Sequence, residues 1–286
     1  MNPYRSVLYM PGSNARALEK ARSLAADALI LDLEDAVAPD AKDAARDLVC
    51  AAIAEGFGAR KVLLRVNGAD TPWGSADLEA AIAARPDGIL LPKVNGPADI
   101  ARVAAAMGAD HPSTLWAMIE TPRGVLNALA IAEAPGMEGV VLGTNDLVKD
   151  LGARPGPDRA ALVPALAQTL LAARACGLVC LDGVYNAFKD EAGLRAEAEQ
   201  GRSLGFDGKT LIHPAQIAIA NEVFGPTEAE IAESKEIADA YEAAREQGKG
   251  VAVLNGRIVE NLHVETARAT LAKADAIARL SAQSKG

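Results

Sequence analysis

The sequence predicts an α/β chain, a (β/α)8 TIM barrel followed by a C-terminal helix–hairpin–helix extension. Three observations predict this fold. Eight short apolar runs recur up to Leu211, most of them are continuous rather than alternating, and amphipathic segments separate them. Continuous apolar runs are typical of parallel strands covered on both faces, and eight strand–helix units are the number that closes a barrel.

The elements follow one another in this order along the chain. The expected strands are Ser6–Met10, Ala28–Leu33, Val62–Val66, Gly88–Leu91, Leu115–Ile119, Gly139–Leu142, Leu178–Leu181 and Gly208–Leu211. The expected helices between them include Asn14–Ala25, Ala41–Ala54, Ala98–Met107, Arg123–Ala132 and Arg159–Ala175. An open, doubly wound sheet is the alternative fold. It would place eight strands in one row, and no GxGxxG motif follows the first strand.

The pattern changes after the last strand. Pro214–Val223 fits the eighth helix, and Thr227–Gln247 fits a long helix that opens with a capping box of Thr227 and Glu230. Asn255-Gly256 then joins two short apolar runs, which indicates a hairpin, and Leu262–Leu280 fits a final helix. We expect a catalytic barrel over residues 1–224. Residues 225–286 are too few for a core of their own, so we expect them to pack on the barrel or on a neighbouring subunit.

Composition excludes several classes of protein. The chain has 286 residues, a formal net charge of −9, three His and three Cys. An acidic chain without a basic stripe is no general nucleic-acid binder, and no run approaches the ~20 apolar residues that span a bilayer. The N-terminus has no long apolar run, so we expect no signal peptide, and we expect Cys50, Cys176 and Cys180 to form neither a disulfide framework nor a zinc site. We expect a cytoplasmic protein with a small-molecule substrate.

Ionisable residues follow most of the expected strands. In such barrels the active site lies at the C-terminal ends of the strands. We interpret these residues as an acidic cup that binds a hard cation, with Arg65 and Lys93 facing an anionic substrate. A ring of satisfied salt bridges is the alternative. The residues are Asp32, Glu34, Asp35, Arg65, Lys93, Glu120, Asp146, Asp182 and Lys209.

Glu120 and Asp146 carry the metal hypothesis. They follow neighbouring strands, so that their carboxylates can converge on one ion. Two carboxylates completed by water and substrate oxygens usually hold Mg²⁺, and Mn²⁺ is the alternative ion. No Cys or His lies near these strand ends, which disfavours zinc and copper. We expect His111, His213 and His263 to be structural or solvated.

Covalent catalysis and phosphate binding have weaker support. No GxSxG motif is present, and no Ser or Cys at a strand end lies beside a His. The turn Pro11–Asn14 can hold an anion at a helix N-terminus, or it is a plain cap. Four cations would extend a phosphate patch there, unless they only form solvated faces: Arg16, Lys20, Lys42 and Arg46.

Seven segments at these strand ends occur in a recognisable order. They are Arg5–Ser13, Asp32–Val37, Arg65–Asn67, Leu91–Lys93, Ile119–Thr121, Gly143–Asp146 and Asp207–Pro214. Together they resemble the citrate lyase β-subunit-like family within the HpcH/HpaI aldolase superfamily. The resemblance covers the whole chain. Within the family, Asp182–Phe188 and Val259–His263 are most similar to the branch of malyl-CoA lyases and thioesterases.

The resemblance implies a Mg²⁺-dependent barrel that acts on a 3-hydroxyacyl-CoA whose acyl end carries a carboxylate. By it, Glu120 and Asp146 match metal ligands, and Arg65 matches the arginine that binds a carboxylate or enolate oxygen of the substrate. Glu34 and Asp35 match the acidic pair beside that arginine, and the family's arginine on the first helix is Asn14 here. The resemblance further places Tyr9, Lys20, Thr121 and Asn145 in the substrate-binding set.

The resemblance also implies a homotrimer or homohexamer in which the C-terminal segment reaches a neighbour's site. Lyases of the family place an acid–base Asp just after the hairpin, where this chain has Glu260. One more methylene changes the reach of the carboxylate by more than the ~0.5 Å that catalysis tolerates. A carboxylate that only activates water for hydrolysis is compatible with this change.

Three functions remain open from the sequence. The first is hydrolysis of (3S)-malyl-CoA to malate and CoA by a CoA thioester hydrolase. The second is a malyl-CoA or citramalyl-CoA lyase, which cleaves a C–C bond to give an oxo-acid and an acyl-CoA. The third is a non-catalytic CoA-binding subunit, which would have lost the metal pair that Glu120 and Asp146 retain.

Overall fold

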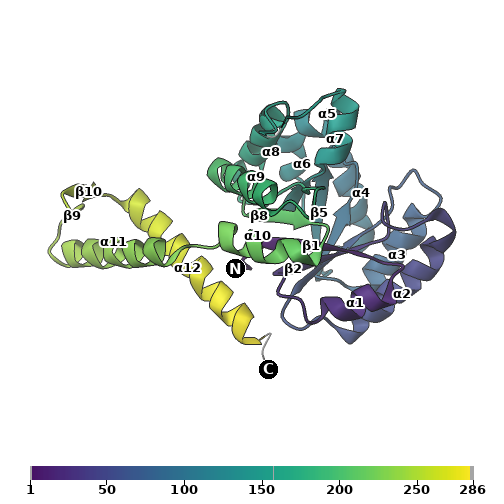
Figure 1. Ribbon diagram of the computed structural model, residues 1–286, viewed down its shortest axis with the longest axis horizontal. Helices are drawn as coiled ribbons and strands as arrows, with labels where there is room; N and C mark the ends of the chain where they lie inside the picture. Colours follow the sequence, from purple (N-terminus) through teal and green to yellow (C-terminus); the bar gives the residue numbers. More distant parts are fainter. Residues whose placement is uncertain (1, 157, 284–286) are drawn as a thin grey trace.

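Eight strands between Ser6 and Leu211 form a closed parallel barrel. The computed structural model describes residues 2–156 and 158–283. Each strand is hydrogen-bonded to the next, and β8 pairs with β1 to close the ring (Figure 1). The predicted barrel is confirmed. Its strands are β1 (Ser6–Pro11), β2 (Ala28–Asp32), β3 (Lys61–Arg65), β4 (Gly88–Leu91), β5 (Thr114–Ile119), β6 (Met137–Leu142), β7 (Val179–Asp182) and β8 (Gly208–Leu211).

Helices surround the barrel, as the amphipathic segments predict (Figure 1). They are α1 (Ala15–Ala21), α2 (Lys42–Glu55), α3 (Gly74–Ala84), α4 (Pro97–Met107), α5 (Pro122–Leu126), α6 (Ala128–Ala132), α7 (Thr144–Leu151), α8 (Val163–Ala175), α9 (Glu191–Leu204) and α10 (Ile217–Phe224). Two expectations are wrong in detail. The segment Arg123–Ala132 is two short helices, because Asn127 leaves the helical conformation between them. Helix α8 starts after Arg159, whose φ of +52° is incompatible with a continuous helix.

One large side chain fills the N-terminal half of the barrel. Trp116 on β5 is fully buried among residues of the inner barrel layer. A Cβ at Gly88 on β4 would lie 2.7 Å from its ring, and a Cβ at Gly139 on β6 would lie 2.4 Å from it. Glycines on both neighbouring strands therefore make room for Trp116. Because this end is packed, only the opposite end of the barrel can open into a site.

The C-terminal extension forms an arm that projects from the barrel (Figure 1). It consists of α11 (Glu228–Glu246), β9 (Ala252–Leu254), β10 (Arg257–Val259) and α12 (Asn261–Gln283). The predicted capping box of Thr227 and Glu230 is confirmed. So is the hairpin turn, where Asn255 and Gly256 both have positive φ, as a type I′ turn requires.

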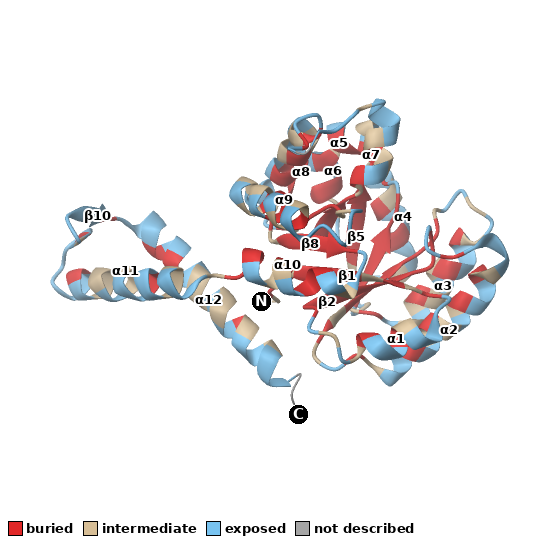
Figure 2. Ribbon diagram, viewed as in Figure 1, coloured by how far each residue is buried: buried red, intermediate tan, exposed pale blue. Residues whose placement is uncertain are grey.

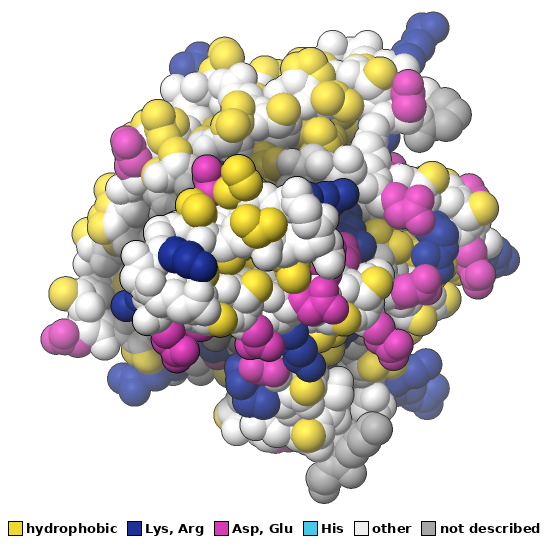
Figure 3. Space-filling view, turned by 90° about the vertical axis from the view of Figure 1, so that its left-hand side faces the viewer, with side chains coloured by type: hydrophobic (Ala, Val, Ile, Leu, Met, Phe, Trp, Pro, Cys, Tyr) yellow, Lys and Arg dark blue, Asp and Glu magenta, His cyan; other side chains and the backbone are white. Residues whose placement is uncertain are grey.

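The arm has a small apolar cluster of its own and is otherwise mostly exposed (Figure 2). Lys273 on α12 connects the arm to the barrel by donating to the Asp207 backbone carbonyl. Seen from its free end, the arm carries hydrophobic side chains on its surface (Figure 3). At the hairpin they include Val251, Val253, Ile258 and Leu262, of which Val253 is 70% exposed. Within the described residues, no helix is long and apolar enough to cross a membrane.

Candidate active site

Arg65 and Asp32 form the buried centre of the barrel mouth. They end β3 and β2, and the strand register places them side by side. Arg65 Nε donates to Asp32 Oδ1 at 2.7 Å, and Nη2 donates to Oδ2 at 2.6 Å. Asp32 also accepts the backbone N–H groups of Glu34 and Ala36. It therefore orients both the guanidinium and the loop after β2, a role that the sequence analysis did not assign.

The acidic pair beside Arg65 is divided between two environments. Glu34 is buried, with Oε2 2.9 Å from Arg65 Nη1, whereas Asp35 is exposed and lies 3.7 Å from the same nitrogen. Burial raises the pKa of Glu34, and the charge of Arg65 opposes that shift. The Tyr9 ring lies 5.0 Å from the guanidinium carbon. Its hydroxyl is buried without a hydrogen-bond partner among the described residues, which suits a ligand group.

Glu120 follows β5 and points into the same mouth. Its Oε1 accepts the backbone N–H of Lys93 at 2.7 Å. A Cβ on Gly143 would lie 2.4 Å from Glu120 Oε2. The close approach of the Glu120 side chain to the backbone of residue 143 therefore requires glycine there. Burial and, next, the nearby charge of Glu34 raise the pKa of Glu120 to about 8, although the hydrogen bond from the Lys93 backbone N–H opposes the shift. Without a cation beside it, Glu120 therefore holds its proton more tightly than an exposed glutamate does.

Asp146 reaches the mouth from a helix. It lies in the first turn of α7, four residues after β6 ends, and not directly at the strand end as expected. Its Oδ2 is 3.3 Å from Lys93 Nζ, which is also 3.3 Å from Glu34 Oε1. The Lys93 ammonium thus lies between two carboxylates on opposite sides of the mouth.

A cavity of about 300 Å³ lies at the mouth, whereas Glu34 and Lys93 line a neighbouring cavity. Glu120 and Asp146 both line the cavity at the mouth, as do Arg65, Asp35, Tyr9 and Asn145. The donor set fits a hard divalent cation, because two carboxylates that follow neighbouring strands face one cavity. Among the described residues, no three His, Cys, Asp or Glu side chains are grouped to hold an ion alone. Water and substrate oxygens would complete the coordination, as is usual for Mg²⁺.

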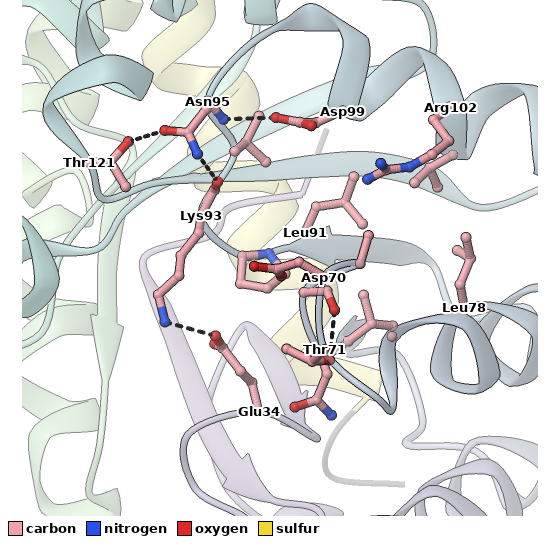
Figure 4. A pocket seen from close by; sticks show the side chains of 18 residues that line it. Glu34, Asp70, Thr71, Leu78, Leu91, Lys93, Asn95, Asp99, Arg102 and Thr121 are labelled. Atoms are coloured by element: carbon pink, nitrogen blue, oxygen red, sulfur yellow. Dashed lines mark hydrogen bonds and ion pairs between the residues drawn. The ribbon is translucent and has the colours of Figure 1, made fainter.

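The two further predicted binding residues, Thr121 and Asn145, differ in their relation to this cavity. Thr121 caps α5 and donates to Asn95 Oδ1 at 2.6 Å, and it lines a neighbouring cavity that it shares with Glu34 and Lys93 (Figure 4). Asn145 does line the mouth and exchanges two amide hydrogen bonds with Asn186.

Two of the four cations of the expected phosphate patch, Lys42 and Arg46, are engaged with other groups of the chain. Lys20 is exposed on α1 and does not line the cavity at the mouth. Asn14 caps α1 by accepting the Ala17 N–H, so this turn is a plain cap. Lys42 is buried and donates to the Leu33 and Glu34 carbonyls and to Asn67. Arg46 is paired with Asp77. The expectation that Lys42 extends a phosphate patch is therefore wrong.

The expectation that β7 and β8 add charge to the mouth is also wrong. Side chains two positions apart on a strand point to the same face of the sheet. Asp182 is two residues after Cys180, and Lys209 is two residues before Leu211. Because Cys180 and Leu211 belong to the layer between barrel and helices, Asp182 and Lys209 also point outward. Both are fully buried there, 2.9 Å apart, with Arg159 and Glu197 completing a four-charge cluster. These charges are paired with one another and stabilise the barrel wall.

Glu260 lies on the arm, at the start of α12, and is exposed. Its backbone N–H donates to His263 Nδ1. The other two His residues also have structural contacts, His111 with the Ile82 carbonyl and His213 with the Ala215 N–H. Glu260 does not line the mouth of its own barrel.

The fold and the site define a class, a (β/α)8 barrel whose mouth combines a carboxylate pair with a buried arginine. The model of the HpcH/HpaI aldolase/citrate lyase family matches residues 5–214, and the chain belongs to this family.

Known relatives extend over nearly the whole chain. A (3S)-malyl-CoA thioesterase of Cereibacter sphaeroides is 59% identical over 282 residues, which are 98% of each chain. Citrate lyase subunit beta of Escherichia coli is 37% identical over 95% of this chain and 93% of its own. The solved structure of the protein CitE from Mycobacterium tuberculosis, in complex with magnesium, acetoacetate and coenzyme A, has a TM-score of 0.77. It is 29% identical and covers 94% of this chain and 97% of its own.

Proposed function

We propose that this chain is a Mg²⁺-dependent thioesterase that hydrolyses (3S)-malyl-CoA to malate and CoA. One observation carries the proposal: the thioesterase relative is 59% identical over 98% of both chains, arm included. The complex of the Mycobacterium tuberculosis relative with magnesium and coenzyme A supports the same cofactor and substrate class.

The residues of the mouth have separate roles in this reaction. Glu120 and Asp146 would hold the ion, which would supply electrostatic stabilisation of negative charge on substrate oxygens. Arg65, fixed by Asp32, binds the carboxylate of the malyl group through the second N–H of Nη2, which Asp32 does not use. Glu34 holds the remaining guanidinium nitrogen. The electrostatic environment is thus organised before substrate arrives.

We further propose that Glu260 serves the site of a neighbouring subunit in a homotrimer or homohexamer. It is exposed on a projecting arm, and apolar hairpin residues such as Val253 and Ile258 are exposed beside it. Exposed apolar patches of this kind mark protein interfaces. There the carboxylate would deprotonate the water that attacks the thioester carbonyl. Residues 1–224 would form the catalytic barrel and residues 225–286 the assembly arm.

A cytoplasmic location is part of the proposal. CoA thioesters are intracellular metabolites, and the three cysteines are free.

A malyl-CoA or citramalyl-CoA lyase is the second candidate, because the citrate lyase relative matches 95% of the chain. Purified protein with (3S)-malyl-CoA and Mg²⁺ distinguishes the two. Hydrolysis releases malate and the free thiol of CoA, whereas cleavage by a lyase releases glyoxylate and acetyl-CoA without a free thiol. Glyoxylate without malate would overturn the thioesterase. Activity that survives EDTA, or that survives in Glu120→Ala, would overturn the metal assignment.

A further inference from the structure

Lys93 contacts both proposed metal ligands, through two different groups. Its backbone N–H donates to Glu120 Oε1 at 2.7 Å. Its side-chain ammonium lies 3.3 Å from Asp146 Oδ2 and 3.3 Å from Glu34 Oε1. The contact with Glu34 is visible in Figure 4. One residue therefore positions the first carboxylate and neutralises the second.

A hydrogen-bonded loop holds Lys93 in this position. Its φ is +50°, a left-handed conformation that is uncommon for residues other than glycine. Asn95 stabilises the turn by donating to the Lys93 carbonyl at 2.9 Å, and its side-chain oxygen accepts the Thr121 hydroxyl (Figure 4). Asp99 accepts the backbone N–H of Asn95 at 2.9 Å. The loop fixes the backbone of Lys93 while leaving its side chain 50% exposed.

The side chain has room to move. Lys93 and Glu34 line the neighbouring cavity of about 520 Å³, whose other lining residues include Leu78, Leu91 and Val103. If the Lys93 ammonium moves away from Asp146, it can stay beside Glu34 at the edge of this cavity. It then remains paired with a carboxylate and is not buried among apolar side chains.

We propose that Lys93 is a built-in counter-cation that competes with the divalent metal ion for Asp146 and thereby sets the affinity of the site for the ion. This inference rests on the proposed metal site at Glu120 and Asp146. A unit positive charge close to a cation site weakens cation binding by Coulomb repulsion, and it occupies an oxygen that the ion would use. Lys93 is thus a positioning residue that keeps metal binding weak and reversible.

The test compares two substitutions that remove the ammonium in different ways. Lys93→Gly keeps the backbone N–H to Glu120 and is compatible with the positive φ, whereas Lys93→Met keeps the length of the side chain. The matched control is Lys149→Met, which removes an exposed lysine on the same helix as Asp146. Mn²⁺ alone is titrated into the full-length proteins by calorimetry, without substrate. We expect both Lys93 variants to bind Mn²⁺ about tenfold more tightly and the control to change less than about twofold.

Thermal melting gives a second measurement that does not depend on activity. In EDTA the Lys93 variants leave Glu34 and Asp146 without their shared counter-cation, so we expect their Tm to fall below that of the wild type. Saturating Mn²⁺ should raise their Tm by more than it raises that of the wild type, because a tighter ligand stabilises more.

The outcomes separate this inference from the proposed metal site. Asp146→Asn is the reference for that site and should bind Mn²⁺ much more weakly. If it does, and both Lys93 variants bind no more tightly than the wild type, the role of Lys93 is overturned alone. If the wild type binds no Mn²⁺, or Asp146→Asn binds it equally well, the metal site and the role of Lys93 are both overturned.

Discussion

Asp32 and Arg65, adjacent in the register of β2 and β3, form a two-point ion pair that is almost fully removed from solvent. The guanidinium plane is therefore fixed by the strands themselves and not by a mobile loop. A site built on rigid elements holds its geometry without substrate, which lowers the cost of ordering it during the reaction.

Asp32→Asn should damage both catalysis and stability. The substitution keeps the shape but removes the charge that orients Arg65. We expect kcat/KM to fall about 10²-fold and the free energy of unfolding to fall by about 3 kcal/mol. Steady-state kinetics and urea unfolding measure these changes. Asp43→Asn, which disrupts an ion pair whose acid is 84% exposed, should cost less than about 1 kcal/mol. Wild-type kinetics in Asp32→Asn would contradict the role of this pair.

Glu120 should make metal-free protein less stable as the pH rises. Its pKa of about 8 in the folded state exceeds that of an unfolded glutamate, so the folded state binds the proton more tightly. This stabilisation is complete below about pH 4 and is lost as the pH rises through about 8. In EDTA, the free energy of unfolding of the wild type should therefore fall relative to Glu120→Gln between pH 5 and 8. The slope is at most about 1.4 kcal/mol per pH unit. If the free energies of unfolding of the wild type and of Glu120→Gln change in parallel with pH, the raised pKa of Glu120 is contradicted.

Lys209→Met should strongly destabilise the barrel wall. It leaves Asp182 and Glu197 buried with Arg159 as their remaining partner. Removing one member of a buried ion cluster costs about 3–5 kcal/mol. The control Lys61→Met disrupts the pair with Asp87, whose side chains are about one-third exposed, and should cost less than about 1 kcal/mol. Equal losses in urea unfolding would show that burial of the cluster is not what matters.

Glu260→Gln and Arg65→Ala should complement each other. Each variant alone lacks one part of every site, so each should be nearly inactive. When the two are co-expressed, randomly mixed oligomers contain sites with Arg65 from one chain and Glu260 from its neighbour. About one-quarter of the wild-type activity should return if the arm serves an adjacent subunit. If both residues act within one chain, no activity returns in the mixture.

The sequence predicts the strands well because their apolar runs are continuous, but the same continuity hides which residues face inward. Asp182 and Lys209 end or interrupt such runs like the other charged residues. They nevertheless point outward, because each lies two positions from an outward-facing residue, Cys180 or Leu211. Only the closed barrel defines inside and outside, so the composition of a fully buried strand cannot supply this distinction.

Contacts between strands set a second limit on what can be predicted from the sequence. The predicted importance of Arg65 follows from its place after a strand, whereas its pairing with Asp32 depends on the register of two strands that are 33 positions apart. The left-handed conformation of Lys93 is likewise hard to predict, because the Asn95 side chain that donates to the Lys93 carbonyl is itself held by Thr121 from the next strand end. Such features arise from tertiary structure and not from propensity.

The pairing of β1 with β8 has a consequence for how the chain is made. The ring closes through residues about 200 positions apart, so Ser6–Pro11 has no partner along one edge until Leu211 has left the ribosome. At about 5–20 residues per second, translation leaves this apolar edge open for about 10–40 s. Newly made N-terminal strands therefore need protection from self-association, and a truncation before β8 would leave that edge permanently exposed.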